Sequence, residues 1–273
     1  MNRLNYYLNQ RFKLSQSKNI QEKLKIRETS FILEKLKISS TSKINICKYF
    51  PKNSNTLRTL IKELIKERGN ECDLNDIDTS EITDMSALFQ GSEFNGDISA
   101  WDVSNVEDMM QMFCYSKFNG DISRWNVSNV QNMQGIFYNS EFNQDISGWN
   151  VSNVTNMINM FKNNEEFNQD ISDWNVSKVT DMTGMFSGSN FNNDISKWNI
   201  NKVKYMDLMF KNSKFNQDIS SWNVSKVKSM RAMFHGSEFN QDISDWKINK
   251  KCDMTFMFDD CPLQNNPPQW YKK

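Results

Sequence analysis

The side chains that could carry out catalysis occur in few of the combinations that catalysis needs. His235 is the only histidine of the chain, which excludes a pair of histidines for acid–base work and a metal site built from several histidines. We expect His235 to be a surface residue. The sequence contains no Gly-rich phosphate loop and no GxSxG or HExxH motif. We therefore predict that the protein is not an enzyme, with no catalytic residues, no cofactor and no bound metal.

The cysteines also lack the spacing of a chemical site. Their number is odd and no CxxC pair exists, which argues against a disulfide framework and against a zinc site. We expect all of them to be reduced thiols, which favours a reducing compartment. They are Cys47, Cys72, Cys114, Cys252 and Cys261.

Aspartate, tryptophan, phenylalanine and methionine recur in one register, every 24 residues with a single step of 25. The consensus unit is FNxDISxWNVSxVxxMxxMFxxSx, and the extra residue falls at 163–166, where we expect a surface loop. The tryptophans that we expect to form a structural core ladder are Trp101, Trp125, Trp149, Trp174, Trp198, Trp222 and Trp246.

Two of these columns offer a chemical alternative to a structural role. An aspartate column could bind calcium, but repeats of that kind need Gly-rich nonapeptides, which this sequence lacks. We expect Asp97 and Asn95 to bond backbone groups of their own turn and of the next unit. A tryptophan column could form a platform for sugars or bases. We expect it to pack in the core instead, because Trp101 and its equivalents occupy inward positions.

The elements that position these columns follow from the apolar spacing within one unit. Ile98, Trp101 and Val103 match the LxxLxL core of a leucine-rich repeat and predict a short strand near Trp101. The later apolar positions step by three, three and four, which predicts about two turns of helix ending near Phe113. The expected fold is an α/β repeat solenoid, a leucine-rich-repeat-like stack of short parallel strands and short helices, with an α-helical N-terminal region.

Charge divides the chain into a basic head and an acidic body. Residues 1–70 hold 16 basic and 5 acidic residues, a net of +11, and the remainder holds 17 and 28, a net of −11. We predict a basic, partly helical or disordered region at 1–52 and a capping helix within 53–72, amphipathic over 57–68 and ended by Gly69. Residues 73–273 form the solenoid, with about seven full repeats and partial end caps.

A candidate binding face follows from the one position that varies within the regular unit. The residue before each tryptophan should point outward, because the tryptophan beside it points inward. A changing outward residue on a constant scaffold is typical of a recognition surface. The positions that we assign to this face are Arg124, Asp173, Lys197, Ser221 and Asp245.

The consensus resembles the BspA-like, Mycoplasma-lipoprotein type of leucine-rich repeat, a domain of unknown function. The resemblance covers about 73–270 and implies a right-handed repeat solenoid. It also implies a bacterial surface protein that acts in adhesion or interaction, and it supplies no catalytic residues. In one unit it is carried by Phe118, Asn119, Asp121, Ile122, Trp125, Val127, Val130, Met133 and Phe137.

Three functions remain open at this point. The first is a non-catalytic module for protein–protein or surface interaction. The second is an adhesin for carbohydrate or a host surface. The third is a phage-associated structural or packaged protein with a basic targeting segment, since about 40 N-terminal residues are vaguely similar to some gut-phage proteins. Nucleic acid would bind only through residues 1–70.

The sequence also bears on location. We find no export signal, lipid-attachment cysteine or membrane span. This favours an intracellular or virion-associated protein, although members of the resembled family often lie at the bacterial surface.

Overall fold

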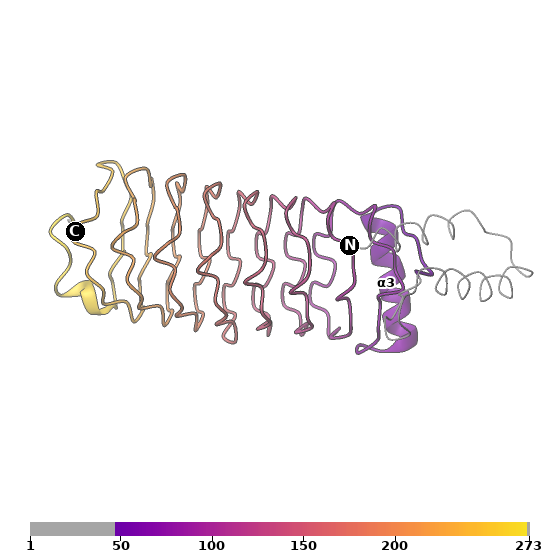
Figure 1. Cartoon of the computed structure of the whole chain (residues 1–273). Helices are drawn as coiled ribbons and strands as arrows, with labels where there is room; N and C mark the ends of the chain where they lie inside the picture. Colours follow the sequence, from indigo (N-terminus) through magenta and orange to yellow (C-terminus); the bar gives the residue numbers. More distant parts are fainter. Residues whose placement is uncertain (1–46, 272–273) are drawn as a thin grey trace, which may run out of the picture.

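Each 24-residue unit of the sequence forms one coil, and the coils stack into an elongated body (Figure 1). This computed structural model describes residues 47–271. Helix α3 (Ser54–Arg68) lies at the N-terminal end of the stack, and the short 3-10 helix η1 (Pro262–Gln264) lies near the C-terminal end. Most of the predicted basic region 1–52 falls outside the described residues.

The prediction of an α/β solenoid is wrong. Between α3 and η1 the described chain contains no helix, and no strand longer than one residue. Neighbouring coils are joined instead by isolated parallel bridges that share one register, such as Asp84 with Asp108 and Asp108 with Asn132. The body is therefore a stack of turns held by bonds between coils, rather than layers of strands and helices.

The predicted helix ending near Phe113 is a run of tight turns. The N–H of Met112 donates to the carbonyl of Met109 over 3.2 Å, and Gln111 between them has a φ of 55°. A second turn follows with Tyr115 at a φ of 56°. A negative φ at the second residue followed by a positive φ at the third is the pattern of a type II turn. Two such turns put Met109, Met112 and Phe113 on the inner side, as a helix would, so the apolar spacing did not separate the two structures.

The predicted strand near Trp101 is also a turn. The N–H of Trp101 donates back to the carbonyl of Ile98 over 3.1 Å, so this segment folds on itself instead of pairing with its neighbour. The indole supplies the link between coils at this point. Each Nε1–H donates to a backbone carbonyl of the preceding coil over 3.0–3.2 Å, for example from Trp125 to Ile98.

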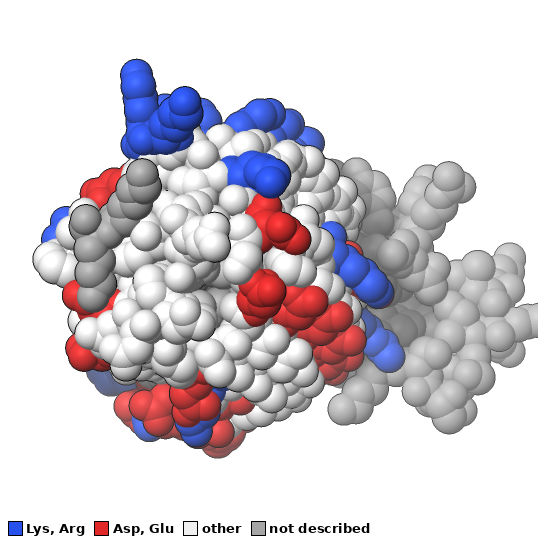
Figure 2. Space-filling model, turned by 90° about the vertical axis from the view of Figure 1, so that its left-hand side faces the viewer, with Lys and Arg blue, Asp and Glu red and all other residues white. Residues whose placement is uncertain are grey.

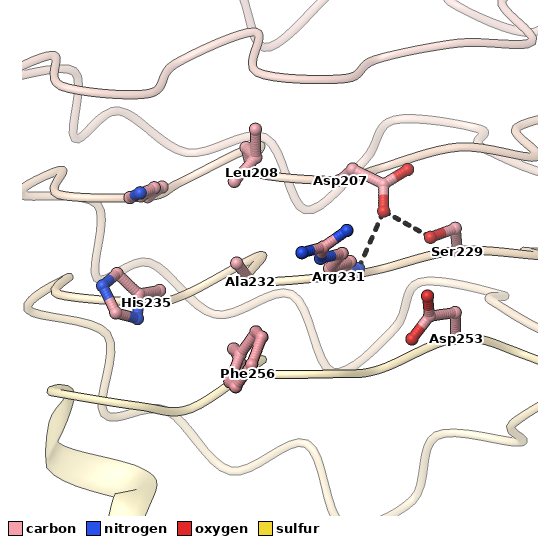
Figure 3. A pocket seen from close by; sticks show the side chains of 9 residues that line it. Asp207, Leu208, Ser229, Arg231, Ala232, His235, Asp253 and Phe256 are labelled. Carbon is pink, nitrogen blue, oxygen red and sulfur yellow. Dashed lines mark hydrogen bonds between the residues drawn. The ribbon is translucent and has the colours of Figure 1, made fainter.

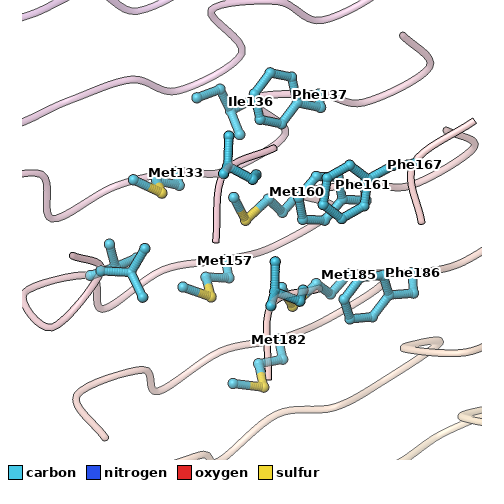
Figure 4. Close-up of a cluster of buried hydrophobic side chains, with 14 of the residues drawn as sticks. Met133, Ile136, Phe137, Met157, Met160, Phe161, Phe167, Met182, Met185 and Phe186 are labelled. Carbon is cyan, nitrogen blue, oxygen red and sulfur yellow. The ribbon is translucent and has the colours of Figure 1, made fainter. Parts of the chain in front are cut away.

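The core consists of columns of like side chains. Met133, Met157 and Met182 follow one another in one column, beside a column of phenylalanines (Figure 4). The rings of Phe137 and Phe161 lie 5.6 Å apart at their centroids, and both are fully buried. The tryptophans of the ladder are 3–4% exposed. Burial of a large aromatic side chain contributes on the order of 2–3 kcal/mol, so these columns hold the stack together.

Polar side chains fix the corners of each coil. The carboxylate of Asp97 accepts from the N–H of Ser99 in its own turn over 2.9 Å. The side-chain carbonyl of Asn95 accepts from the N–H of Asn119 in the next coil over 2.7 Å. The predicted bonding of these two positions is thus confirmed, and it lets the aspartate column be explained by turn structure alone.

Helix α3 covers the first coil. It begins three residues before the predicted helix because Asn53 caps it, with Thr56 completing a capping box, and it ends at Gly69 with a φ of 88°. Its buried side chains, Leu57 among them, join the core of the stack. Ser54 Oγ and an Arg58 guanidinium nitrogen donate to carbonyls at the edge of the first coil, those of Asp84 and Ser86.

Candidate functional site

One side of the stack carries the most variable side chains. We call it the turn face and define it as the outward residues of the segment 107–115 and its equivalents in the other coils. Because the coils stack in one register, equivalent residues of this face form columns one coil apart. The column that contains Met110 changes character at every step: Met110, Gln134, Ile158, Thr183, Asp207, Arg231 and Thr255.

The exposed aromatic side chains gather on the turn face. Among the described residues, the large hydrophobic side chains that remain exposed are Tyr115 at 52%, Tyr205 at 39% and Phe256 at 51%. All three lie in turn-face columns, although the coils bury nearly every other large apolar side chain. Aromatic residues are enriched at protein interfaces, so this distribution marks the turn face as the candidate site.

Backbone conformation indicates that the aromatic residues are not required by the fold. Tyr115 stands in a column whose other members include Gly91, Asn139 and Gly188, and all of these have positive φ. Phe256 likewise has a φ of 60°. Bulky residues are strained in this region, whereas glycine and asparagine are not. The repeated Gly and Asn at these positions were the sequence signal for the turn face, and the helix prediction missed it.

Tyr115 and Tyr138 form a pair across two coils. Their hydroxyls lie 3.1 Å apart and their rings meet edge to face at 5.1 Å. The hydrogen bond from Tyr115, followed by burial, raises the pKa of Tyr138. The Lys162 ammonium lies over the Tyr138 ring, 5.5 Å from its centroid. This part of the turn face offers two hydroxyls, aromatic surface and the Lys162 side chain.

A shallow groove of about 560 Å³ crosses the turn face near the C-terminal end (Figure 3). On its polar side, Asp207 accepts from the hydroxyl of Ser229 and, over 3.0 Å, from the N–H of Arg231. On its apolar side, Phe256 lies under the Arg231 guanidinium at 5.9 Å. The groove therefore combines a charged ridge with an exposed aromatic ring.

His235 lies at the end of this groove rather than fully on the surface. Its side chain is 30% exposed, and Nε2 is 3.9 Å from a carboxylate oxygen of Asp260. Nδ1 is buried and has no hydrogen-bond partner within residues 47–271. The expectation of an ordinary surface histidine therefore holds only for the outer half of the ring.

The predicted binding face lies on another corner of the coils. All five residues are exposed and form a column beside the aspartates. Two of its charges face each other, with Lys197 Nζ 3.9 Å from Asp173 Oδ1, and the hydroxyl of Ser221 donates to the carbonyl of Ser196. Binding by this corner column, Arg124 and Asp245 included, stays a prediction.

The pKa shifts of the column aspartates are those expected of carboxylates that accept hydrogen bonds in turns. The N–H of Ser196 lowers the pKa of Asp194, and the serine two residues on does the same for five other aspartates of the column: Asp121, Asp145, Asp170, Asp218 and Asp242. The cysteines are free, and burial raises the pKa of Cys252 to about 11. In residues 47–271 no three His, Cys, Asp or Glu side chains are arranged to hold a metal ion.

The comparisons with known proteins concern the repeats. A family model described as Mycoplasma protein of unknown function, DUF285, matches residues 59–174, 118–212 and 157–270. Neither a curated protein nor a solved structure matches the chain significantly. None of the helices described is long and apolar enough to cross a membrane.

Proposed function

This chain belongs to the DUF285 family of Mycoplasma proteins of unknown function, and from that premise we propose that it is a non-catalytic protein-binding repeat protein whose partner contacts the turn face. The observation that carries the proposal is the position of Tyr115, Tyr205 and Phe256, which stay exposed on one face of a stack that buries nearly all of its other large apolar side chains.

Energetic arguments support a binding role for these residues. Each exposed aromatic ring leaves apolar area in water, and Tyr115 and Phe256 add backbone strain at positive φ. The fold itself does not need an aromatic residue at the register of Tyr115, because other coils hold Gly or Asn there. A partner that covers the rings would recover the apolar contribution, and amphipathic tyrosines are frequent anchors of such contacts.

The test uses substitutions that the stack already contains. Tyr115→Asn installs the residue found at 139, and Tyr205→Asn installs the residue found at 132 and 156 in its register. Both asparagines suit these turns, so the variants should fold. The full chain and the double variant serve as baits for partners from the source cells, identified by cross-linking and mass spectrometry.

The control bait carries Arg124→Ala and Lys197→Ala on the corner column. A partner bound by the wild-type chain and by this control, but at least tenfold less by the tyrosine double variant, supports the turn face. A partner that both variants retain, or that only the corner variant loses, contradicts the proposal.

A further inference from the structure

One face of the stack carries opposite charges at its two ends. We call it the charged face and define it as the side chains that segment 102–107 and its equivalents leave at least partly exposed, so it adjoins the turn face along the column of Glu107. Its charged residues in the first two coils are all acidic: Glu81, Asp102 and Glu107. The next two coils hold none, and the last four coils hold only lysines: Lys178, Lys202, Lys204, Lys226, Lys228, Lys247, Lys250 and Lys251.

Most of these charges are available to a partner. All eight lysines are exposed, and none of them forms an ion pair within residues 47–271. Asp102 and Glu107 likewise form no ion pair in that range, whereas Lys52 pairs with Glu81 over 2.9 Å. In the view from the C-terminal end, Lys and Arg side chains gather along the upper side of the molecule (Figure 2).

The neighbouring columns do not cancel this polarity. The next column of the turn face holds an aspartate in two coils at each end of the stack: Asp84, Asp108, Asp181 and Asp253. With these included, the first two coils hold five carboxylates against Lys52, a net of −4, and the last four hold eight lysines against two aspartates, a net of +6. The corner column on the other side mixes both signs along its length.

The fold itself favours asparagine where some of these lysines stand. In the register of Lys202, Lys226 and Lys250, three earlier coils hold an asparagine whose side-chain nitrogen donates to a carbonyl of the preceding coil over 2.7–2.8 Å. Within the described chain the three lysines form no such bond. They also follow one another at about 4.8 Å, where like charges repel. An acidic surface opposite them would offset this cost.

The polarity of the charged face indicates which partner fits its whole length. A uniform polyanion would meet carboxylates at the N-terminal end, and a uniform polycation would meet lysines at the other end. The fitting partner has basic, neutral and acidic parts in the reverse order. The charged face of a second copy, turned end over end, has this order, and its charges repeat at the same coil spacing.

We propose that the protein forms a homodimer in which the charged faces of two copies meet antiparallel, about a twofold axis between the coils 142–166 and 167–190. Such an axis places each column opposite the same column of the other copy, with the coils in reverse order. Twofold contacts between identical surfaces are the commonest in protein oligomers. The proposal goes beyond the proposed function and does not rest on it, because it involves no molecule other than this chain.

This arrangement brings mostly opposite charges together. By register, Glu107 comes opposite Lys228 of the other copy, and Glu81 comes opposite Lys250. In the adjoining column of the turn face, Asp84 comes opposite Asp253, a like-charge pair at the outer end of the contact. The twofold axis doubles each pair, so opposite pairs outnumber like pairs.

Sedimentation equilibrium of the purified full chain tests for the dimer. The dissociation constant should rise at least tenfold between about 0.1 M and 1 M salt, because the screening length falls from about 10 Å to about 3 Å. A chain that stays monomeric at about 100 μM, where even a weak dimer forms, would overturn the proposal. No partner from the cell is present, so this result is independent of the capture experiment on the turn face.

Glu107→Lys and Lys228→Glu test the antiparallel register. The two positions belong to one column, and each substitution installs the residue that the other position holds, so both variants should fold. Either one alone should weaken the dimer at least about tenfold, because two opposite pairs become like pairs. In an equimolar mixture of the two variants, every reversed residue meets an opposite charge. The mixture should therefore dimerise within about threefold of the wild type.

Lys214→Glu is the matched control. It makes the same charge change outside the charged face and installs the glutamate found at 141 and 238 in its register. It should leave the dimer unchanged. Reversal variants that dimerise as the wild type does, a mixture that stays monomeric, or equal weakening by the control would each overturn the proposal.

Discussion

Replacement of Gly135 by alanine distinguishes a turn from a helix by the sign of its effect. Gly135 lies within the segment first predicted to be helical, where Ala in place of Gly stabilises by about 0.8–1 kcal/mol. In the structure Gly135 has a φ of 59° at the positive-φ position of a type II turn. An L-residue there costs about 1–2 kcal/mol, partly offset by about 0.4–1 kcal/mol from a less flexible unfolded chain. We expect Gly135→Ala to lower the free energy of unfolding by about 1 kcal/mol.

Steric overlap does not complicate this estimate. An added Cβ would lie 3.4 Å from Gln111 Cγ and 3.6 Å from Tyr138 Cβ, which is ordinary contact. Gly148→Ala is the control, because no atom lies within 4 Å of its Cβ and its φ is not positive. It should be neutral or stabilise by up to about 1 kcal/mol. Gly135→Asn should cost less than Gly135→Ala, since asparagine tolerates this conformation.

Urea unfolding followed by tryptophan fluorescence gives the comparison, with the transition midpoint read at an unchanged slope. Stabilisation by Gly135→Ala equal to that of Gly148→Ala would refute the turn and restore the helix. Destabilisation by both variants to the same extent would refute the assignment of the cost to positive φ.

Three further predictions concern the tryptophan, aspartate and cysteine side chains. Trp174→Phe removes the 3.1 Å hydrogen bond from the indole to the Ile146 carbonyl at a site that is 3% exposed. It should lower the free energy of unfolding, measured in urea, by about 2–4 kcal/mol. A loss below about 1 kcal/mol would contradict a structural role of the tryptophan ladder. The pKa of Asp194 is lowered from 3.8 on folding, so its stabilisation is present above that value and lost as the pH falls through the folded pKa. Asp194→Asn keeps the acceptor for Ser196, and its urea midpoint should fall less between pH 7 and pH 3 than that of the wild type; an equal fall would exclude this role. Burial raises the pKa of Cys252 to about 11 from an ordinary 9.0. At pH 8 this thiol should therefore react with iodoacetamide about 100-fold more slowly in the native chain than in urea. Equal rates in the two states would contradict its burial.

The sequence was sufficient to find the repeat, its inward columns and the lid helix. Identical spacing of Trp, Phe, Met and Asp favours an arrangement in which like residues stack, and an amphipathic stretch before the first unit is suited to cover its open end. The bonding of Asp97 and Asn95 was predictable for the same reason, because short polar side chains at turns bond nearby backbone groups.

The conformation within each coil was not predictable from apolar spacing. Steps of three and four residues suit one face of a helix, and two successive type II turns produce the same steps. The distinguishing residues were Gly135 and Gly184, which lie inside the predicted helical segment, where a helix would prefer alanine. The error in fold carried over to the site, because outward helix positions differ from outward turn positions. The exposure of Tyr115, Tyr205 and Phe256 depends on how the coils stack, so it could not be predicted from the residue types alone.

The bonds between coils have an evolutionary consequence. They join each coil to its immediate neighbours, and the same bonds return one unit later. A duplication or deletion of one whole unit in the gene would therefore change the length of the protein by about 4.8 Å and require no new core residue. The 25-residue unit is tolerated because the buried Asn164 turns the chain through bonds to the N–H groups of Glu166 and Phe167. Unequal recombination between such similar units would thus vary the reach of the molecule, and with it the number of contact positions, in whole steps.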